Sequence, residues 1–328
     1  MIITKTPYRI SFFGGGSDYP KWYRKFGGSV LSTTIDKHIY ISCRYLPGFF
    51  KHKYRIVWSK IENVTNINEI EHHAIKNLLK YLKFKKGLEI HYDGDLPARS
   101  GMGSSSSFVV GLMKAIISIN KKKISQQNLG KKAIFFEQNV LNEVVGSQDQ
   151  IAASVGGLNK IKFNKNGSIK VKKIKQNKKL KKLEKNLLLI YTSINRTAHE
   201  IASSYVNNLT KSKKKYIESI ITHVNEGEKI LKTGNIDDFG ELLHSSWMLK
   251  KKLSSAISNS KIDDLYNHAL ISGASGGKLL GAGGGGFLLL YMKKKYRKKF
   301  FLKSKKLINI PFKFSNIGSE VIYNNFQS

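Results

Sequence analysis

The sequence predicts a mixed α and β protein, and two kinds of pattern support this. Residues 28–46 are rich in β-branched and aromatic side chains with partial alternation, which is typical of strands. Residues 68–84 instead space their apolar side chains as an amphipathic helix does. Both patterns recur along the 328 residues, so we expect a sizeable core in one large domain or two ordinary ones.

The other elements of the first half follow in order. Residues 87–97 alternate apolar and polar side chains and end in a turn, which predicts a strand. An apolar helix is expected after the serine run that begins at Ser104, and a further helix is expected over 128–144. Residues 156–174 are typical of a hairpin with an Asn-Gly turn.

The second half begins after a lysine-rich stretch at 170–185, which is the predicted domain junction. We therefore expect a first domain over 1–180 and a second over 181–328. A buried strand follows the junction, then several amphipathic helices over about 197–274. A glycine loop that enters a strand is predicted near residues 278–294.

The charge of the chain is strongly positive. It has 57 basic and 22 acidic residues, a net charge of +35, and the excess is almost entirely lysine. Such a field is typical of proteins that bind nucleic acid, anionic membranes or anionic metabolites. The lysines accompany many Ile and Asn residues, which indicates a coding bias toward A/T-rich codons. We therefore expect solvated surface rather than a nucleic-acid site, although an anionic small substrate would still be attracted.

Cysteine usage and hydropathy indicate the compartment. Cys43 is the one cysteine, so an intramolecular disulfide is excluded and nothing suggests secretion. The N-terminal residues lack the apolar core of a signal peptide, and the apolar run at 287–292 is too short to cross a bilayer. The prediction is a cytoplasmic protein without a membrane partner.

Three glycine-rich segments, at 9–19, 101–107 and 281–286, are candidates for chemistry. In the middle one, glycines let backbone N–H groups converge on an anion, and the following helix adds its partial positive charge. The absence of Gly-Lys-Ser/Thr excludes a Walker A loop, and a dinucleotide fingerprint fits poorly. The segment is thus either a phosphate loop or an ordinary capped helix start.

The third segment precedes a strand, so no helix dipole supports it. It is either a tight turn or a place that something bulky or charged approaches closely, because four consecutive glycines cost much conformational entropy. Carboxylates are scarce, which draws attention to Asp18, Glu137 and Asp149. Asp149 could accept a proton from a hydroxyl, or it could be an ordinary turn or cap aspartate.

Taken together, the segments "PYRISFFGGGSDY", "LPARSGMGSSSSF" and "SGASGGKLLGAGGGGF" resemble the three ordered signatures of the GHMP kinases. Within that superfamily the chain is most similar to the D-glycero-D-manno-heptose 7-phosphate kinases. The resemblance runs from residue 3 to about 287. It implies an α+β, two-domain GHMP kinase fold with the active site in the cleft between the domains.

The resemblance also implies roles for residues at matching positions, with ATP and Mg²⁺ as cofactors. Asp149 would be the catalytic base, and Arg9 would hold it ionised and neutralise the transferred group. Ser105 and Glu137 would ligate Mg²⁺, and Ser107 would face the packing of its helix. The ATP-binding residues would be Gly101, Met102, Gly103, Ser104, Ser105 and Ser106. The substrate-binding residues would be Gly15, Gly16, Ser17, Asp18, Arg196, Gly284 and Gly285.

The implied reaction is phosphorylation of the anomeric hydroxyl of the heptose 7-phosphate, for nucleotide-activated heptose synthesis. Such a substrate needs a second anion site, for which the candidates are Arg196, Lys37, Arg44 and Lys278. The nearest alternative is a kinase of the same fold that acts on an unphosphorylated, fucose- or galactose-like sugar. A non-catalytic sensor is disfavoured by the retained base and metal ligands. The expected partners are ATP and a phosphorylated sugar, not nucleic acid, and a homodimer is a further possibility.

Overall fold

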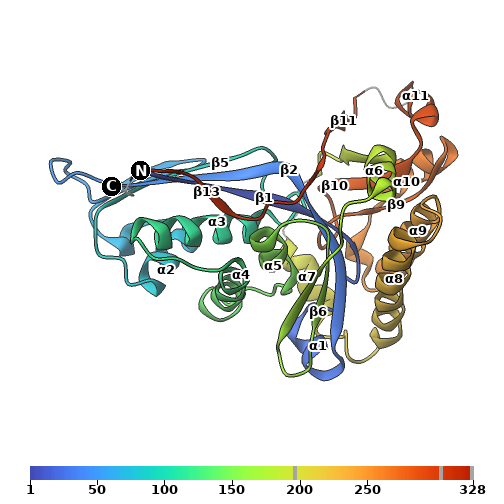
Figure 1. The fold of residues 1–328 in the computed structure, drawn as a ribbon, viewed down its shortest axis with the longest axis horizontal. Helices are drawn as coiled ribbons and strands as arrows, with labels where there is room; N and C mark the ends of the chain where they lie inside the picture. The colour runs from blue at the N-terminus through green and yellow to red at the C-terminus, as the bar shows by residue number, and fades with distance from the viewer. Residues whose placement is uncertain (195–197, 303–305, 326–328) are drawn as a thin grey trace.

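A computed structural model describes residues 1–194, 198–302 and 306–325 of the chain. In this part of the chain the strands form two sheets, one of nine strands and one of four. The larger sheet is built by the first half of the sequence and by two strands near the C-terminus. The smaller sheet contains strands from the second half alone. Figure 1 shows the large sheet extending to one side and the small sheet with its helices at the other end.

The large sheet is centred on two long antiparallel strands, β1 (Ile2–Phe13) and β2 (Gly28–Tyr45). Its main path runs in the order β13-β1-β2-β5-β3-β4, and β6 and β12 also pair with β2. The remaining strands of this sheet are β3 (Tyr54–Val57), β4 (Ile61–Val64), β5 (Leu88–Gly94), β6 (Asn159–Phe163), β7 (Ile169–Lys173), β12 (Phe314–Ser315) and β13 (Glu320–Asn324).

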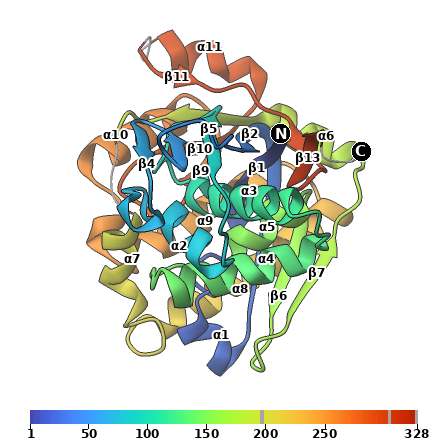
Figure 2. The ribbon, with the colours of Figure 1, turned by 90° about the vertical axis from the view of Figure 1, so that its left-hand side faces the viewer.

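Helices of the first half cover one face of this sheet, and α3 lies along β1 and β2 (Figures 1 and 2). α3 is apolar on most sides, and Leu112, Met113 and Ile116 are fully buried in the main core. Its burial against the sheet fixes the position of the glycine-serine loop at its N-terminus. The helices of this half are α1 (Pro20–Phe26), α2 (His73–Tyr81), α3 (Ser104–Ile119), α4 (Gln126–Phe135) and α5 (Gln148–Val155).

The small sheet has the strand order β11-β8-β10-β9. Its central strand β10 is completely buried, because helices α9 and α10 pack against the sheet. Helices α8 and α9 also contact β1, so they join the two halves. The strands are β8 (Leu187–Tyr191), β9 (Ala274–Leu279), β10 (Phe287–Met292) and β11 (Ile308–Asn309). The helices are α6 (Lys178–Asn186), α7 (Ala198–Val206), α8 (Lys214–Lys232), α9 (Asp238–Lys251), α10 (Ser260–Ile271) and α11 (Lys294–Leu302).

Most predicted elements are confirmed, with four differences. The long strand is β2, the hairpin is β6–β7, and the buried strand after the lysine-rich stretch is β8. The helix expected from residue 68 begins at His73, after a short 3₁₀ turn. The helix expected over 128–144 starts at Gln126 and ends in a wider π-helical turn, Phe136–Val140. The third glycine loop connects two strands, β9 and β10, rather than only entering one.

The fourth difference concerns the end of the chain. β13 pairs antiparallel with β1, and β12 pairs with β2, so the last described strands return to the large sheet. The boundary at residue 180 stays a prediction, but residues 314–324 belong by their pairing to the first half. No helix among the described residues has the length and apolar character needed to span a membrane.

Candidate active site

The second and third glycine segments touch each other between the two sheets. A Cβ atom on Gly101 would lie 2.6 Å from the Leu280 carbonyl oxygen, and one on Gly281 would lie 2.5 Å from the Gly101 Cα. Both residues also have positive φ angles, 81° and 73°, which side chains rarely tolerate. The close approach expected at the third segment is therefore made by the backbone of the second. We call this contact between Gly101 and Gly281 the glycine junction.

The first segment supplies a charged pair beside the glycine junction. Arg9 on β1 donates from Nε and Nη2 to the two carboxylate oxygens of Asp149, at 2.7 and 2.6 Å. Its third nitrogen, Nη1, donates to the Gly101 carbonyl at 2.7 Å. Arg9 is only 4% exposed, so this bidentate pair is well shielded from water. The structure thus brings together residues that lie 140 positions apart in the sequence.

Asp149 and the serine loop face each other at two helix starts. Asp149 lies in the first turn of α5, where the helix dipole favours a negative charge. Gly103 has a left-handed conformation at the N-cap of α3, and a Cβ there would lie 3.3 Å from the Asp149 carboxylate. The free N–H groups of the first turn of α3 therefore begin next to the carboxylate. This arrangement suits an anion held between the loop and Asp149.

The four serines of the loop have different surroundings. Ser105 is exposed, whereas Ser106 and Ser107 are buried. The Ser107 hydroxyl donates to the Pro7 carbonyl at 2.9 Å, as its predicted packing role requires. Ser106 donates to both carboxylate oxygens of Glu137, at 2.8 and 3.1 Å. Glu137 therefore contacts Ser106, and no described contact joins it to Ser105, its predicted partner.

Glu137 lies in the π-helical turn that follows α4, a local distortion that is common at functional sites. Its side chain is fully buried, and burial is the main reason that the pKa of Glu137 is raised to about 8. The Gln150 amide nitrogen also donates to it, while the buried Gln150 Oε1 lacks a hydrogen-bond partner among the described residues. A hydroxyl, a carboxylate and an unpaired amide oxygen form an all-oxygen donor set, which fits Mg²⁺.

Asp18 is buried at the end of the first glycine turn, at 1% exposure. Its Oδ1 accepts from the Gly16 backbone N–H at 3.0 Å, and Gly146 leaves no room for a Cβ beside its Oδ2. Burial, and then the charge of Asp149, raise the pKa of Asp18 to about 6. The charge of Asp149 therefore acts on Asp18, and the role of Asp18 toward a sugar hydroxyl stays a prediction.

Ser17, a predicted substrate ligand, is fully buried. Its hydroxyl donates to the carbonyls of Gly14 and Ser29 and accepts from the Ser29 N–H. The two bonds with Ser29 tie the glycine turn to β2 and the bond to Gly14 closes the turn itself, so the structure gives Ser17 a role in holding the turn. Gly15 lies closer to the site, since a Cβ there would come 3.9 Å from the Gln148 amide nitrogen.

The other predicted substrate ligands lie at the third loop. Gly284 donates its N–H to the Ile257 carbonyl at 2.8 Å, and a Cβ on Gly285 would lie 2.2 Å from the Ile194 carbonyl oxygen. Close backbone packing thus accounts for Gly285, and a positive φ of 77° accounts for Gly284. Arg196 lies outside the described residues. Of the other phosphate candidates, Arg44 is paired with Glu89 at 2.6 Å on the large sheet.

Lys278 and Lys250 add positive charge beside the glycine junction. Lys278 is 5% exposed and donates to the Phe12 carbonyl at 2.8 Å; burial, and then the charge of Arg9, lower its pKa to about 7. Lys250 on α9 donates to the Gly281 carbonyl at 2.5 Å. Burial lowers the pKa of Lys250 well below its usual value, and Lys278 and Arg9 lower it further. The sequence did not single out Lys250, because it stands in a run of three lysines.

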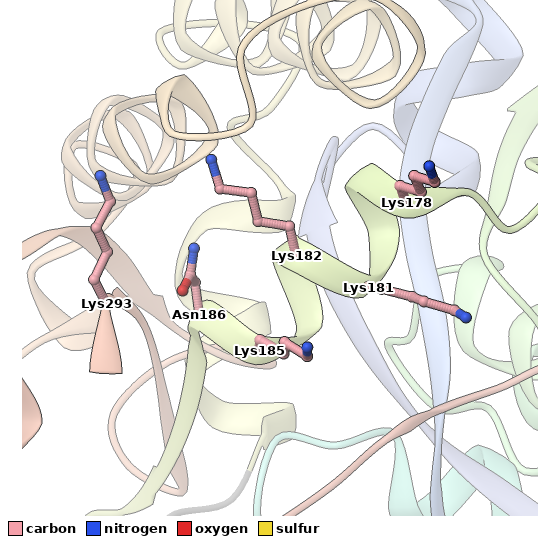
Figure 3. Close-up of a pocket in the computed structure, with 6 residues that line it drawn as sticks. All are labelled: Lys178, Lys181, Lys182, Lys185, Asn186 and Lys293. Atoms are coloured by element: carbon pink, nitrogen blue, oxygen red, sulfur yellow. The ribbon is translucent and has the colours of Figure 1, made fainter. Parts of the chain in front are cut away.

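A strongly basic pocket lies elsewhere, on α6 and the end of β10. It has a volume of about 550 Å³ and is lined by Lys178, Lys181, Lys182, Lys185, Asn186 and Lys293. Figure 3 shows its lysines pointing in different directions rather than toward one point. Asp237 pairs with Lys293 at 2.8 Å and with Lys182 at 3.6 Å, which offsets part of the charge. We call this region the basic pocket and do not place the active site there.

Comparison with known proteins agrees with the fold. The model of the GHMP kinase N-terminal domain matches residues 68–157, and the model of the GHMP kinase C-terminal domain matches residues 228–303. The two matches together span half of the chain. The chain belongs to the GHMP kinases, a family of phosphoryl-transfer enzymes that use ATP.

Particular relatives are similar over most of the chain. D-glycero-alpha-D-manno-heptose 7-phosphate kinase from Campylobacter jejuni is 28% identical over 298 residues, which cover 85% of this chain and 86% of that protein. The bifunctional fucokinase/GDP-fucose pyrophosphorylase of Arabidopsis thaliana is 26% identical over 84% of this chain and 28% of its own length. The structure of a D-glycero-D-manno-heptose 1-phosphate kinase from Bacteroides thetaiotaomicron matches with a TM-score of 0.81 and 23% identity, covering 99% of this chain and all of the other.

Proposed function

We propose that this protein transfers the γ-phosphoryl group of ATP to the anomeric hydroxyl of D-glycero-D-manno-heptose 7-phosphate, giving the 1,7-bisphosphate. The observation that supports phosphoryl transfer best is the bidentate Arg9–Asp149 pair at the start of the serine loop. It combines a hydroxyl-orienting carboxylate with an anion-binding loop at one point. The similarity to the Campylobacter heptose 7-phosphate kinase supports the choice of sugar.

The chemistry requires one bond to form and one to break. The anomeric oxygen attacks the γ-phosphorus, the bond from that phosphorus to the β–γ bridging oxygen breaks, and ADP leaves with the electron pair. The hydroxyl proton passes to Asp149. Both oxygens of Asp149 accept hydrogen bonds from Arg9, which fix the carboxylate where it can orient the hydroxyl and receive the proton late. A loose transition state needs little more than this from its base.

The loop and its neighbours would stabilise the charge of the phosphates. Backbone N–H groups at the start of α3 would contact the phosphate oxygens, and the glycines would allow the close approach. Ser106 and Glu137, with Ser105 nearby in sequence, would hold Mg²⁺, whose charge would neutralise the β- and γ-phosphates when bound. Asp18 would accept hydrogen bonds from sugar hydroxyls. A cytoplasmic location and a homodimer stay predictions.

A sugar panel tests the proposal directly. The purified protein is incubated with ATP and heptose 7-phosphate, heptose 1-phosphate, galactose or fucose, and ADP release and ³¹P NMR of the product are recorded. We expect turnover with heptose 7-phosphate and a new anomeric phosphate resonance. The two heptose-kinase relatives are named for substrates phosphorylated at different carbons, so both positions are included.

The nearest alternative is a kinase for an unphosphorylated sugar, which the similarity to the plant fucokinase favours. In that case galactose or fucose would be turned over and the heptose phosphates would not. The Asp149→Asn variant serves as the matched control, because any transfer that depends on this site should be lost with it. Activity that survives in this variant would come from a contaminating kinase or from chemistry at another site.

A further inference from the structure

Lys250 reaches the glycine junction from the opposite side to Arg9. Its Nζ donates to the carbonyls of Gly281 and Leu279, at 2.5 and 3.3 Å. Arg9 donates to the Gly101 carbonyl on the other side of the contact. One cation from each half of the molecule therefore holds one of the two glycine loops. Both side chains end where the loops touch.

The same region holds more basic side chains than carboxylates that could pair with them. Arg9 pairs with Asp149, whereas the described contacts of Lys250 and Lys278 at this site are backbone carbonyls. The charges are close enough that each affects the others, since Lys278 and Arg9 both disfavour the protonated form of Lys250. Concentrating unpaired cations at a poorly hydrated place is costly unless an anion joins them. Burial and mutual repulsion therefore disfavour the protonated lysines in the free protein, and an anion that joins them where the glycine loops meet would favour their charged forms.

The ammonium groups also retain donors. In its protonated form each has three N–H bonds. Among the described residues, Lys250 uses two of them on carbonyls and Lys278 uses one on Phe12. The remaining donor of Lys250 is available to an acceptor that enters beside Gly281, which lies against Gly101 at the start of the serine loop. The chemistry that satisfies both this donor and the protonated lysines is a phosphoryl group with two or more negative charges.

We propose that Lys250 is a further catalytic residue, which contacts the transferred γ-phosphoryl group together with Lys278 and Arg9. This inference rests on the proposed phosphoryl transfer from ATP. The γ-phosphate is favoured over the sugar's own phosphate by position. Gly281, which Lys250 holds, lies against Gly101 at the start of the ATP loop, and Arg9 connects that glycine to the proton-accepting Asp149.

Nucleotide binding separates this role from a purely structural one. Isothermal titration calorimetry is performed with the ATP analogue AMP-PNP and with ADP on the wild type, Lys250→Met and Lys250→Arg. We expect the Met variant to bind AMP-PNP about 10- to 100-fold more weakly and ADP within about threefold of wild type, since only AMP-PNP carries a γ-phosphate. The Arg variant should recover part of the loss, because it keeps the charge.

Lys251→Met is the matched control. Lys251 is the next residue of the same helix, and its Nζ pairs with Asp263 at 3.1 Å instead of contacting the glycine loops. It should bind both nucleotides as the wild type does. Thermal melting of all variants identifies any that fail to fold, and Lys250→Arg then provides the comparison if Lys250→Met is one of them. If Lys250→Arg keeps the wild-type ratio of AMP-PNP affinity to ADP affinity, the charge contact is supported. If Lys250→Arg binds AMP-PNP and ADP equally well, the site does not sense the γ-phosphate and the contact is overturned.

Other outcomes also decide the question. Equal losses for AMP-PNP and ADP in Lys250→Met would show that Lys250 only positions the loops. No loss for either nucleotide would remove Lys250 from the site. Because no sugar is present, failure of the heptose assignment leaves this test intact. If the wild type bound neither nucleotide, both the inference and ATP-dependent transfer would be overturned.

Discussion

The glycine junction and the basic pocket both concentrate positive charge, but they do so in opposite ways. At the glycine junction, Arg9 and Lys278 are nearly buried. Arg9 pairs with the Asp149 carboxylate and donates to the Gly101 carbonyl, and Lys278 donates to the Phe12 carbonyl. In the basic pocket, the lysines are spread around α6 and β10 and point apart (Figure 3). The basic pocket thus has more lysines than the glycine junction, but these lysines do not converge on one point. The two regions differ in the convergence and burial of their basic groups, and not only in the number of charges.

The physical reason is the difference in solvent. Exposed charges are screened over about 8 Å at physiological ionic strength, and ion pairs between them stabilise a protein by about 1 kcal/mol or less. Charges at a shielded place interact far more strongly, and they are costly to hold there without a partner. At the glycine junction this cost is visible as the lowered pKa of Lys250 and of Lys278, and an anion bound there would relieve it. The basic pocket needs no such explanation.

Among the changes that test this difference between the two regions, removal of the Asp149 carboxylate should have the largest effect on activity. In Asp149→Asn, the group that orients the hydroxyl and accepts its proton is lost, so we expect kcat to fall about 10²- to 10⁴-fold. ATP should still bind, because the loop backbone is unchanged. Steady-state kinetics with heptose 7-phosphate and calorimetry with AMP-PNP measure the two effects.

Asp263→Asn is the control for this variant, since Asp263 pairs with Lys251 on the outer helices. It should retain normal kcat. Asp149→Asn also removes the charge partner of Arg9, so the melting temperature of this variant is recorded as well. Near-normal turnover in a folded Asp149→Asn protein would remove Asp149 from the proposed role.

Much of this site could be predicted from the sequence, because the family motifs carry fixed positions. Arg9, Asp149 and the serine loop were predicted to act together, and the structure places them in contact. Their meeting follows from the backbone: glycines 101 and 281 leave no room for side chains between the loops. Short motifs with such steric requirements therefore allow contacts between distant segments to be predicted, even when the structure of the intervening chain is not known.

The contacts that the sequence did not predict depend on the direction in which each side chain leaves its helix. Lys250, Lys251 and Lys252 are identical in sequence, but successive helical residues point about 100° apart. Lys250 reaches the Gly281 carbonyl and Lys251 pairs with Asp263. The same applies to the serine run, where Ser106 contacts Glu137 and Ser105 is exposed. In a run of identical residues, the sequence alone does not indicate which of them is buried.

The second test of the contrast uses pH. The lowered pKa of Lys278, about 7, means that the free protein loses this charge as the pH rises through 7. Arg9 on β1, Lys250 on α9 and His223 on α8 surround it, and Arg9 disfavours its protonation. If the charge attracts the γ-phosphate, kcat/KM for ATP should fall above about pH 7, by up to tenfold per pH unit.

In Lys278→Arg the charge persists, so this alkaline decline should shift upward by two or more pH units. Stability should change in the opposite sense. The unfolded chain binds the proton of Lys278 between about pH 7 and 10.5 and the folded chain does not, so this residue makes the free energy of unfolding rise with pH over that window. Lys293→Arg in the basic pocket is the control, and an identical alkaline decline in all three proteins would contradict the assignment.

The smallest effect is expected from the basic pocket. Lys178, Lys181 and Lys185 line it, and replacing all three by Gln lowers the net charge without touching the glycine junction. We expect kcat/KM for both substrates to stay within about twofold of wild type at physiological salt, because screening confines each charge to its surroundings. At low salt a somewhat larger drop is expected, since the long-range field steers anionic substrates.

Fluorescence anisotropy with labelled single- and double-stranded DNA should show no binding by the wild type or by the triple variant at physiological salt. Tight, salt-sensitive DNA binding that the triple variant loses would instead make the basic pocket a nucleic-acid site. The lysine excess would then have a function that the arrangement of these side chains does not suggest.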